Sequence, residues 1–168
     1  VIAVEAPATH EATAEMLNAV GYIDLCIPRG GRKLIDFVRD TARIPVIETG
    51  AGVVNTYFDE TGDLEKGKAI VLNAKTRRVS VCNALDCLLV HVARLVDLPA
   101  LVEPLAGKNV VLYADSAAYG QLEGRYPSSL LCEADAESFG REYMDYKMSV
   151  RVVRDIDEAV DHIARYGS

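Results

Sequence analysis

Short apolar runs alternate along this chain with segments whose apolar residues recur at helical spacing. The run 85–91 is apolar almost throughout, whereas a strand with one face in water would alternate apolar and polar residues. Strands of this kind, separated by helices, are typical of a parallel sheet that is buried on both faces. The sequence therefore predicts an α/β fold with three layers, α/β/α, and a mainly parallel sheet.

Capping residues and glycines set the limits of the predicted elements. Thr9 is a candidate N-cap for a helix that runs to about residue 20, where Gly21 ends it, and Asp63 is a candidate N-cap for a helix to about residue 75. Further helices are predicted over 33–40, 93–103, 137–146 and 156–166. Strands are predicted over 1–5, 22–27, 44–48, 53–58, 85–91, 109–113 and 149–153. Segment 122–134 receives no assignment, and the residues around Cys82 fit neither period, which indicates a loop.

The composition limits the classes of function. Half of the 168 residues are apolar, which is enough for a sizeable core in one domain or in parts of two. The net charge of −7 argues against a nucleic-acid-binding surface, because phosphate binding needs a basic patch. A small anionic substrate is compatible with the local pair Arg77 and Arg78. No apolar run is long enough to span a bilayer, so we expect no membrane partner.

The four cysteines and three histidines do not form a metal-binding pattern. No two cysteines have C-x-x-C spacing, and the histidines are far apart in the sequence. We therefore expect no metal site. Reduced thiols are typical of cytosolic proteins, so the sequence predicts a cytoplasmic location.

Cys82 is the strongest candidate for a catalytic side chain. Its flanks carry Arg77, Arg78, Ser80 and Asn83, where a buried strand would carry apolar residues. Nearby cations favour a thiolate, and the backbone and amide groups of a loop can hydrogen-bond a developing oxyanion. The alternative is a buried structural cysteine, which is the usual role of a free thiol. The residues alone give the two interpretations equal weight.

Two other segments carry candidate site residues. Glu48 ends a predicted buried strand, and carboxylates at the carboxyl ends of parallel strands often point into active-site crevices, where they act as bases or move protons. The turn Pro28-Arg29-Gly30-Gly31 joins a predicted strand to a predicted helix, so its backbone can approach an anionic ligand. Each segment also has a simpler interpretation, as a capping acid and as an ordinary tight turn.

Four stretches together give the chain a family resemblance. They are residues 22–31, 44–50, 73–78 continuing through 80–85, and 161–168. On these motifs, which occur in family order, the chain resembles the gamma-glutamyl phosphate reductases, a branch of the aldehyde dehydrogenase superfamily. Two positions depart from the family pattern, because Val79 stands where proline is usual and Cys87 stands where threonine is expected.

The resemblance assigns roles to the candidate residues. Cys82 falls on the family's nucleophile, and Glu48, 34 positions earlier, falls on the superfamily's glutamate. Asn83 would hydrogen-bond the oxyanion through its backbone N–H or its side chain. The implied catalytic residues are Cys82, Glu48 and Asn83, the implied substrate-binding residues are Arg77, Arg78 and Ser80, and the implied cofactor-binding residues are Pro28, Arg29, Gly30 and Gly31.

The reaction that the resemblance implies is NADPH-dependent reduction of L-glutamyl 5-phosphate to L-glutamate 5-semialdehyde and phosphate, in proline biosynthesis, through a thioester on Cys82. The resemblance also implies a homo-oligomer and makes glutamate 5-kinase a candidate partner. Residues 1–52 would be the C-terminal end of a dinucleotide-binding domain and residues 53–168 a truncated catalytic domain, so we expect low activity from the chain alone. Two alternatives stay open: an aldehyde dehydrogenase that hydrolyses the thioester of another substrate, and an inactive domain fragment with a binding or assembly role.

Overall fold

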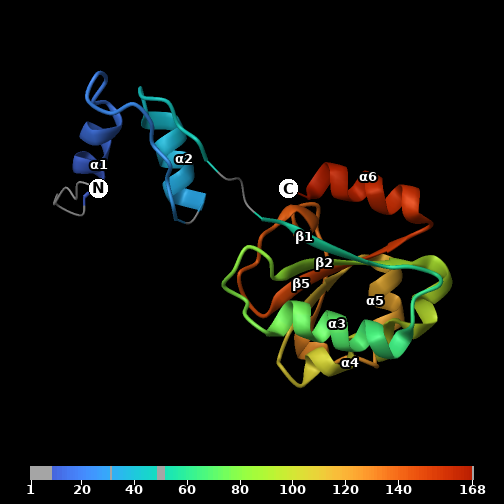
Figure 1. The fold of residues 1–168 in the computed structure, drawn as a ribbon. Coiled ribbons are helices and arrows are strands. Elements are labelled where there is room, and N and C mark those ends of the chain that lie inside the picture. The colour runs from blue at the N-terminus through green and yellow to red at the C-terminus, as the bar shows by residue number, and fades with distance from the viewer. Residues whose placement is uncertain (1–8, 31, 49–51, 168) are drawn as a thin grey trace. The chain divides into compact units, whose positions relative to one another are not determined.

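The structure, a computed structural model, describes residues 9–30, 32–48 and 52–167. The chain forms two compact units, residues 1–50 and 51–168, each of which is considered by itself (Figure 1). The predicted strand 1–5 and the predicted cofactor-binding residue Gly31 lie outside the described residues. The roles predicted for the two parts of the chain stay predictions.

Two short helices belong to the first unit. Helix α1 (His10–Leu17) begins where predicted, because the Thr9 hydroxyl accepts the N–H of Ala12 at 3.2 Å. It ends at Leu17 rather than near residue 20, and Gly21 then adopts a φ of +85°, which glycine tolerates best. Helix α2 (Arg32–Thr41) agrees with its prediction and buries Ile35 and Val38.

The predicted strands 22–27 and 44–48 are wrong as regular strands. They form one isolated parallel bridge, between Cys26 and Val46, and Pro45 has no N–H with which to extend a ladder. Within the described part of the chain, much of their apolar surface is also exposed. The exposed apolar side chains of these two runs are Tyr22, Leu25, Ile27 and Ile47.

A five-stranded parallel sheet organises the second unit (Figure 1). Its strands lie in the order β1-β2-β5-β3-β4, and every neighbouring pair is parallel. The strands are β1 (Val54–Phe58), β2 (Leu85–His91), β3 (Val111–Ala114), β4 (Leu131–Glu133) and β5 (Lys147–Val153). The sheet confirms the predicted α/β class, and the four strands predicted in this unit are all present, with β4 added from the unassigned segment.

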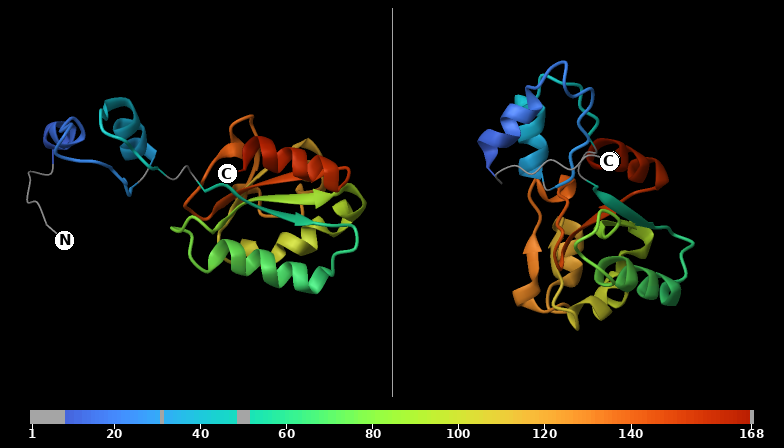
Figure 2. Two further views of the ribbon diagram at one scale, coloured as in Figure 1. Left: turned by 45° about the horizontal axis from the view of Figure 1, so that its top comes forward. Right: turned by 60° about the vertical axis from the view of Figure 1, so that its left-hand side comes forward.

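Helices cover both faces of this sheet, as Figures 1 and 2 show. Helices α3 (Leu64–Thr76), α4 (Leu98–Ala106) and α5 (Ser116–Leu122) lie on one face, and α6 (Ile156–Tyr166) lies on the other. Strand β2 sends Leu88 and Val90 into the larger core under the first three helices, and Cys87 and Leu89 into the smaller core under α6. This strand is apolar nearly throughout because both of its faces are buried. The three-layer prediction is confirmed.

The predicted helix 93–103 is divided in the structure. A 3₁₀ segment, η1 (Val92–Asp97), precedes α4, and Pro99 lies in the first turn of α4. Proline is well tolerated there, because the N–H groups of a first turn have no partner within the helix.

The predicted helix 137–146 is wrong. The structure has a single 3₁₀ turn, η3 (Ser138–Gly140), followed by irregular chain with a bend at residues 145 and 146. The Asp135 carboxylate accepts the N–H groups of Glu137 and Ser138, and the N–H of Tyr143 is bonded to Asp86, far away in the sequence. The N–H groups of Glu137 and Ser138 lie at the start of the segment, where a helix leaves N–H groups without a partner, so Asp135 caps the turn. The N–H of Tyr143 is one that a continuing helix would need, and Asp86 accepts it instead.

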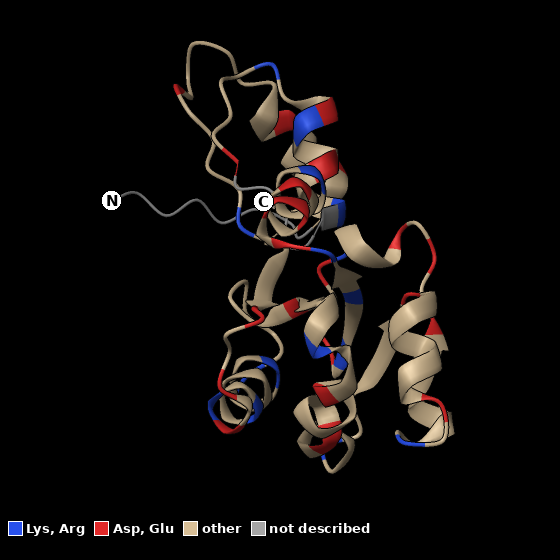
Figure 3. Cartoon of the chain, turned by 90° about the vertical axis from the view of Figure 1, so that its right-hand side faces the viewer, with Lys and Arg blue, Asp and Glu red and all other residues tan. Residues whose placement is uncertain are grey.

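Charged residues of both signs are interspersed along the helices and loops (Figure 3). Within the described residues, no helix is both long enough and apolar enough to cross a membrane. The same part of the chain contains no group of three or more His, Cys, Asp and Glu side chains arranged to hold a metal ion.

Candidate active site around Cys82

Cys82 lies in an irregular loop between helix α3 and strand β2. Residues 77–84 form turns and bends, and the N–H of Ala84 donates to the carbonyl of Val81 at 3.0 Å. The Cys82 side chain is exposed. The loop enters β2 at its amino end, beside the start of β1, because Leu85 pairs with Val54. The predicted loop is confirmed, and the buried interpretation of Cys82 is wrong.

The backbone of Gly52 lies directly against Cys82. A Cβ atom added at Gly52 would be 2.7 Å from the Cys82 carbonyl oxygen and 3.2 Å from the Cys82 Cβ. A neighbouring backbone atom at that distance cannot rotate away as a side-chain tip can. Position 52 therefore requires glycine because of a contact with the candidate nucleophile, a contact 30 residues away in sequence that local reasoning did not identify.

The other candidate residues of this loop are exposed. Arg77 follows the last residue of α3, and its N–H donates to the Asn73 carbonyl at 3.1 Å. Arg78, Ser80 and Asn83 are also exposed on the loop that carries Cys82. The structure thus places two guanidinium groups, a hydroxyl and an amide on one accessible segment with the thiol. Their roles toward a substrate stay predictions.

Glu48 and the turn before α2 belong to the first unit. Glu48 is fixed by Arg39 of α2, whose Nε donates to Glu48 Oε1 at 2.7 Å and whose Nη2 lies 2.6 Å from the same oxygen. Among the described residues, the other oxygen of Glu48 is buried without a hydrogen-bond partner. Pro28, Arg29 and Gly30 precede α2. The approach of any of these residues to Cys82 stays a prediction.

A buried charged pair lies at the neck of the Cys82 loop, which is the place where its two ends, next to Lys75 and Leu85, come together. Sequence reasoning did not identify this pair. Lys75 and Asp86 have side-chain exposures of 0% and 3%, and their charged groups are 4.0 Å apart. Burial lowers the pKa of Lys75 and raises the pKa of Asp86. One signal was present in the sequence: an aspartate inside an otherwise apolar strand needs a buried partner.

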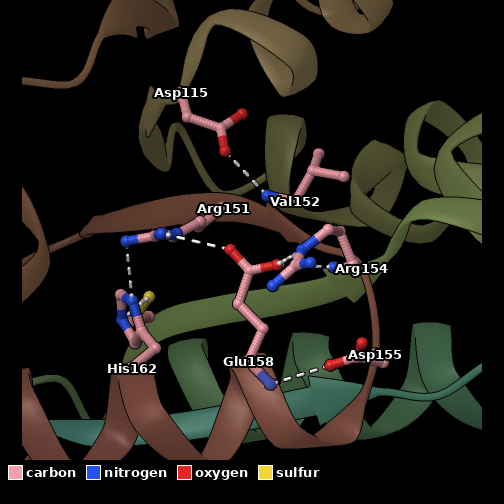
Figure 4. Close-up of polar contacts among 8 residues, drawn as sticks. Asp115, Arg151, Val152, Arg154, Asp155, Glu158 and His162 are labelled. Atoms are coloured by element: carbon pink, nitrogen blue, oxygen red, sulfur yellow. Dashed lines mark hydrogen bonds and ion pairs between the residues drawn. The ribbon is translucent and has the colours of Figure 1, made fainter.

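Cys87 and His162 form a contact that is structural rather than nucleophilic. Cys87 Sγ lies 3.6 Å from His162 Nε2. Arg151 Nη1 lies 3.2 Å from His162 Nδ1 (Figure 4). Arginine only donates, so Nδ1 is the acceptor and Nε2 carries the proton. Burial raises the pKa of Cys87 to about 12 and, with the Arg151 charge, lowers the pKa of His162 to about 4. A protonated thiol beside a neutral imidazole is no thiolate nucleophile.

The buried His162 should make folding stability depend on pH. Its folded-state pKa of about 4 lies below the ordinary value of 6.5, so below pH 6.5 the unfolded chain binds a proton that the folded chain rejects. Stability that is fully present above pH 6.5 is therefore lost as the pH falls towards 4, by about 3 kcal/mol in total. Urea denaturation of the chain between about pH 7 and about pH 4.5 measures this loss. His162→Gln cannot titrate and should show a flatter profile, and equal slopes in the two proteins would contradict the prediction.

Comparison with known proteins shows which proteins the chain resembles. No protein-family model matches the chain. Over 162 residues the chain is 62% identical to a curated gamma-glutamyl phosphate reductase of Pelodictyon phaeoclathratiforme, and the match covers 96% of the chain and 39% of that relative. A reductase of Legionella pneumophila is 57% identical with the same coverage. The predicted resemblance to gamma-glutamyl phosphate reductase is confirmed. The chain spans 39% of the length of these reductases.

Solved structures extend the likeness to the fold. The crystal structure of gamma-glutamyl phosphate reductase from Thermotoga maritima is 35% identical, with a TM-score of 0.86 over 96% of this chain and 38% of that one. An acetylating aldehyde dehydrogenase from Geobacillus thermoglucosidasius is 17% identical, with a TM-score of 0.63 over 95% of this chain and 42% of that one. At that identity the second likeness concerns the fold alone. The aldehyde dehydrogenase-like α/β architecture predicted from the reductase motifs is confirmed.

Proposed function

We propose that Cys82 is the nucleophile of an NADPH-dependent reductase that converts L-glutamyl 5-phosphate to L-glutamate 5-semialdehyde and phosphate in proline biosynthesis. The observation that carries the proposal is the exposed Cys82 thiol on an irregular loop, with the Gly52 backbone packed against it. The 62% identity to a curated gamma-glutamyl phosphate reductase supplies the substrate class. Residues 53–168 then belong to the catalytic domain, and residues 1–52 to the end of the dinucleotide-binding domain.

In the first step the Cys82 thiolate attacks the acyl carbon of the substrate. A carbon–sulfur bond forms, the bond from that carbon to the phosphate oxygen breaks, and phosphate leaves with the bonding electrons. Asn83 stabilises the oxyanion through its N–H or its side-chain amide. Arg77 and Arg78 bind the phosphate or the substrate carboxylate, since a guanidinium group matches both in bidentate geometry. The Ser80 hydroxyl adds a hydrogen bond to the bound substrate.

The turn before α2 suits an approaching dinucleotide. Pro28, Arg29 and Gly30 lead into a ten-residue helix, and the N–H groups at a helix N-terminus favour an anionic group. Gly30 carries no side chain, and a Cβ added there would lie 2.5 Å from Leu34 Cδ2, so a larger residue would require Leu34 to move. With Gly31, these residues would hold the nicotinamide part of the cofactor. When bound, the cofactor supplies the hydride that reduces the thioester.

Glu48 is proposed to move a proton or to place the cofactor. Its Oε1 is engaged by two nitrogens of Arg39, which fixes the orientation of the carboxylate. Its Oε2 is buried and has no hydrogen-bond partner within the described part of the chain, so it is available to accept one hydrogen bond. A reductase must avoid hydrolysing its thioester, and a carboxylate held by arginine is less free to activate water.

The reaction run in the oxidative direction tests this function. A full-length reductase carrying this segment, given L-glutamate 5-semialdehyde and NADP⁺ without phosphate, should release one equivalent of NADPH per Cys82 and then stop. The thioester has then formed, and phosphate is needed to cleave it. Adding phosphate should restore continuous turnover. Absorbance of NADPH follows both phases, and mass spectrometry of the Cys82 peptide detects the acyl group.

The same experiment separates the proposal from its main competitor. Sustained NADPH formation without phosphate would mean that water cleaves the thioester, as in a hydrolytic aldehyde dehydrogenase. No burst, and no acyl group on Cys82, would leave the chain with a binding or assembly role. Repeating the assay with NAD⁺ tests the proposed preference for NADPH.

The proposal also includes a homo-oligomer and contact with glutamate 5-kinase. Sedimentation of the protein with and without the kinase measures both.

A further inference from the structure

Lys75 and Asp86 are two buried charges to which the proposed reaction gives no role. Their side-chain exposures of 0% and 3% place both charged groups out of contact with water. Removing two charges from water has a large cost, and an ion pair inside a protein is often no more stable than an apolar pair of the same size. A buried pair of this kind therefore needs an explanation beyond stability, and its hydrogen bonds provide one.

Lys75 connects the two ends of the Cys82 loop. It lies in the last turn of α3, and its Nζ donates to the carbonyl of Leu85, the first residue of β2, at 2.9 Å. The loop of residues 77–84 lies between these two positions. One buried, charge-assisted hydrogen bond thus closes the neck of the loop that presents Cys82.

Asp86 connects that neck to two other segments. Its Oδ2 accepts the N–H of Val54 at 3.3 Å, and its Oδ1 accepts the N–H of Tyr143 at 2.9 Å. Val54 is the first residue of β1 and follows Gly52 by two positions. Asp86 follows Cys82 by four positions. The Asp86 carboxylate therefore joins the two backbone segments that meet at the Gly52–Cys82 contact, since Asp86 belongs to the segment that follows Cys82 and bonds to the segment that follows Gly52.

We propose that Lys75 and Asp86 are positioning residues that hold the Cys82 loop against segment 52–54. The inference rests on the proposed function, because it assumes that the geometry of Cys82 matters for acyl transfer. Lys75 sets the separation of the loop ends, and Asp86 sets the position of the Gly52 backbone relative to Cys82. Neither side chain contacts the substrate, and both act through the loop.

Lys75→Met tests the inference, because methionine keeps the length and apolar stem of lysine but loses the charge and the donor. The measurement is the rate at which iodoacetamide alkylates Cys82, read by mass spectrometry across a range of pH and compared with a free peptide of residues 76–85. The native rate should differ from that of the peptide, and Lys75→Met should move it towards the peptide rate by at least about threefold. The matched control is Lys66→Met, on the exposed side of the same helix, which should leave the rate and its pH profile unchanged. A folded Lys75→Met protein with a native rate and profile would overturn the proposal.

Hydrogen exchange of the unaltered chain gives a second test that needs no variant. The amide hydrogens of Val54 and Tyr143, which bond to Asp86, should be protected at about the level of strand β2. Exchange of these two amides at the rate of an open loop would overturn the proposal even if Lys75→Met does not fold. Alkylation and exchange report the geometry of the loop whether or not Cys82 is catalytic. Failure of the phosphate-dependence experiment would therefore reject the proposed function, while alkylation and hydrogen exchange would still show whether Lys75 and Asp86 position the loop.

Discussion

Replacing Cys82 with alanine in a full-length reductase that carries this segment should abolish reduction of L-glutamyl 5-phosphate. The expected loss in kcat/KM is at least about 10⁴-fold, because without the thiol no thioester forms and the single difficult displacement is not divided into two steps. Initial rates of NADPH consumption over a range of substrate concentrations measure the loss. Binding of substrate should change little, since Arg77, Arg78 and Ser80 remain.

The matched control for this variant is Cys132→Ala. Cys132 is a partly buried cysteine of strand β4 and has no role in the proposed reaction. It should retain activity within about threefold of the unaltered enzyme, because most substitutions away from a functional site have small effects. Thermal unfolding of both variants checks that the fold is intact. Turnover by a folded Cys82→Ala protein at more than a few per cent of the native rate would contradict the role of Cys82.

Local sequence signals were sufficient where an element is determined by its own residues. The strand predicted over 85–91 and the helix predicted over 156–166 have the observed limits of β2 and α6. The Asp155 side chain accepts the N–H of Glu158 at 2.9 Å, which gives α6 a clear beginning. Cys82 was placed correctly on a loop because its polar flanks match neither a helical nor a strand period.

Long-range contacts explain where the sequence was misleading. Segment 137–146 has helix-forming residues, yet Asp86 takes the N–H of Tyr143 from 57 positions away. The apolar runs 22–27 and 44–48 suggested buried strands, but among the described residues they share a single bridge, Cys26 with Val46. Periodicity describes what a segment can bury and cannot identify the partner that will cover it.

The same distinction applies to the candidate site. The thiol, the two arginines and the amide of the loop are neighbours in sequence, so their common location was predictable. The supporting residues are not neighbours: Gly52 is 30 positions from Cys82, and Lys75 reaches across the whole loop to Leu85. A lysine near the end of a helix is usually solvated, and nothing local distinguishes Lys75 from that common case.

Substituting Gly52 is the second change for which we expect a large effect. Gly52→Ala would place a Cβ 2.7 Å from the Cys82 carbonyl oxygen, so one of the two backbone segments must move. The movement should reduce kcat/KM of the full-length reductase by about 10²-fold, because a displacement of about 1 Å at a reacting group is enough for such a loss. The free energy of unfolding should fall by about 1–3 kcal/mol, as in other overpacked sites. Steady-state kinetics and urea denaturation measure the two effects.

Gly120→Ala is the matched control for this substitution. Gly120 lies within helix α5, and a Cβ added there has no atom within 4 Å. Because alanine favours a helix more than glycine does, the free energy of unfolding should rise by about 0.5–1 kcal/mol, with activity unchanged. The Gly52 loss should fall on kcat rather than on KM, since the substrate-binding side chains of the loop are kept while the thiol is displaced. A Gly52→Ala enzyme with native kcat would show that Cys82 tolerates movement of its backbone, and would remove the reason for a glycine at this position.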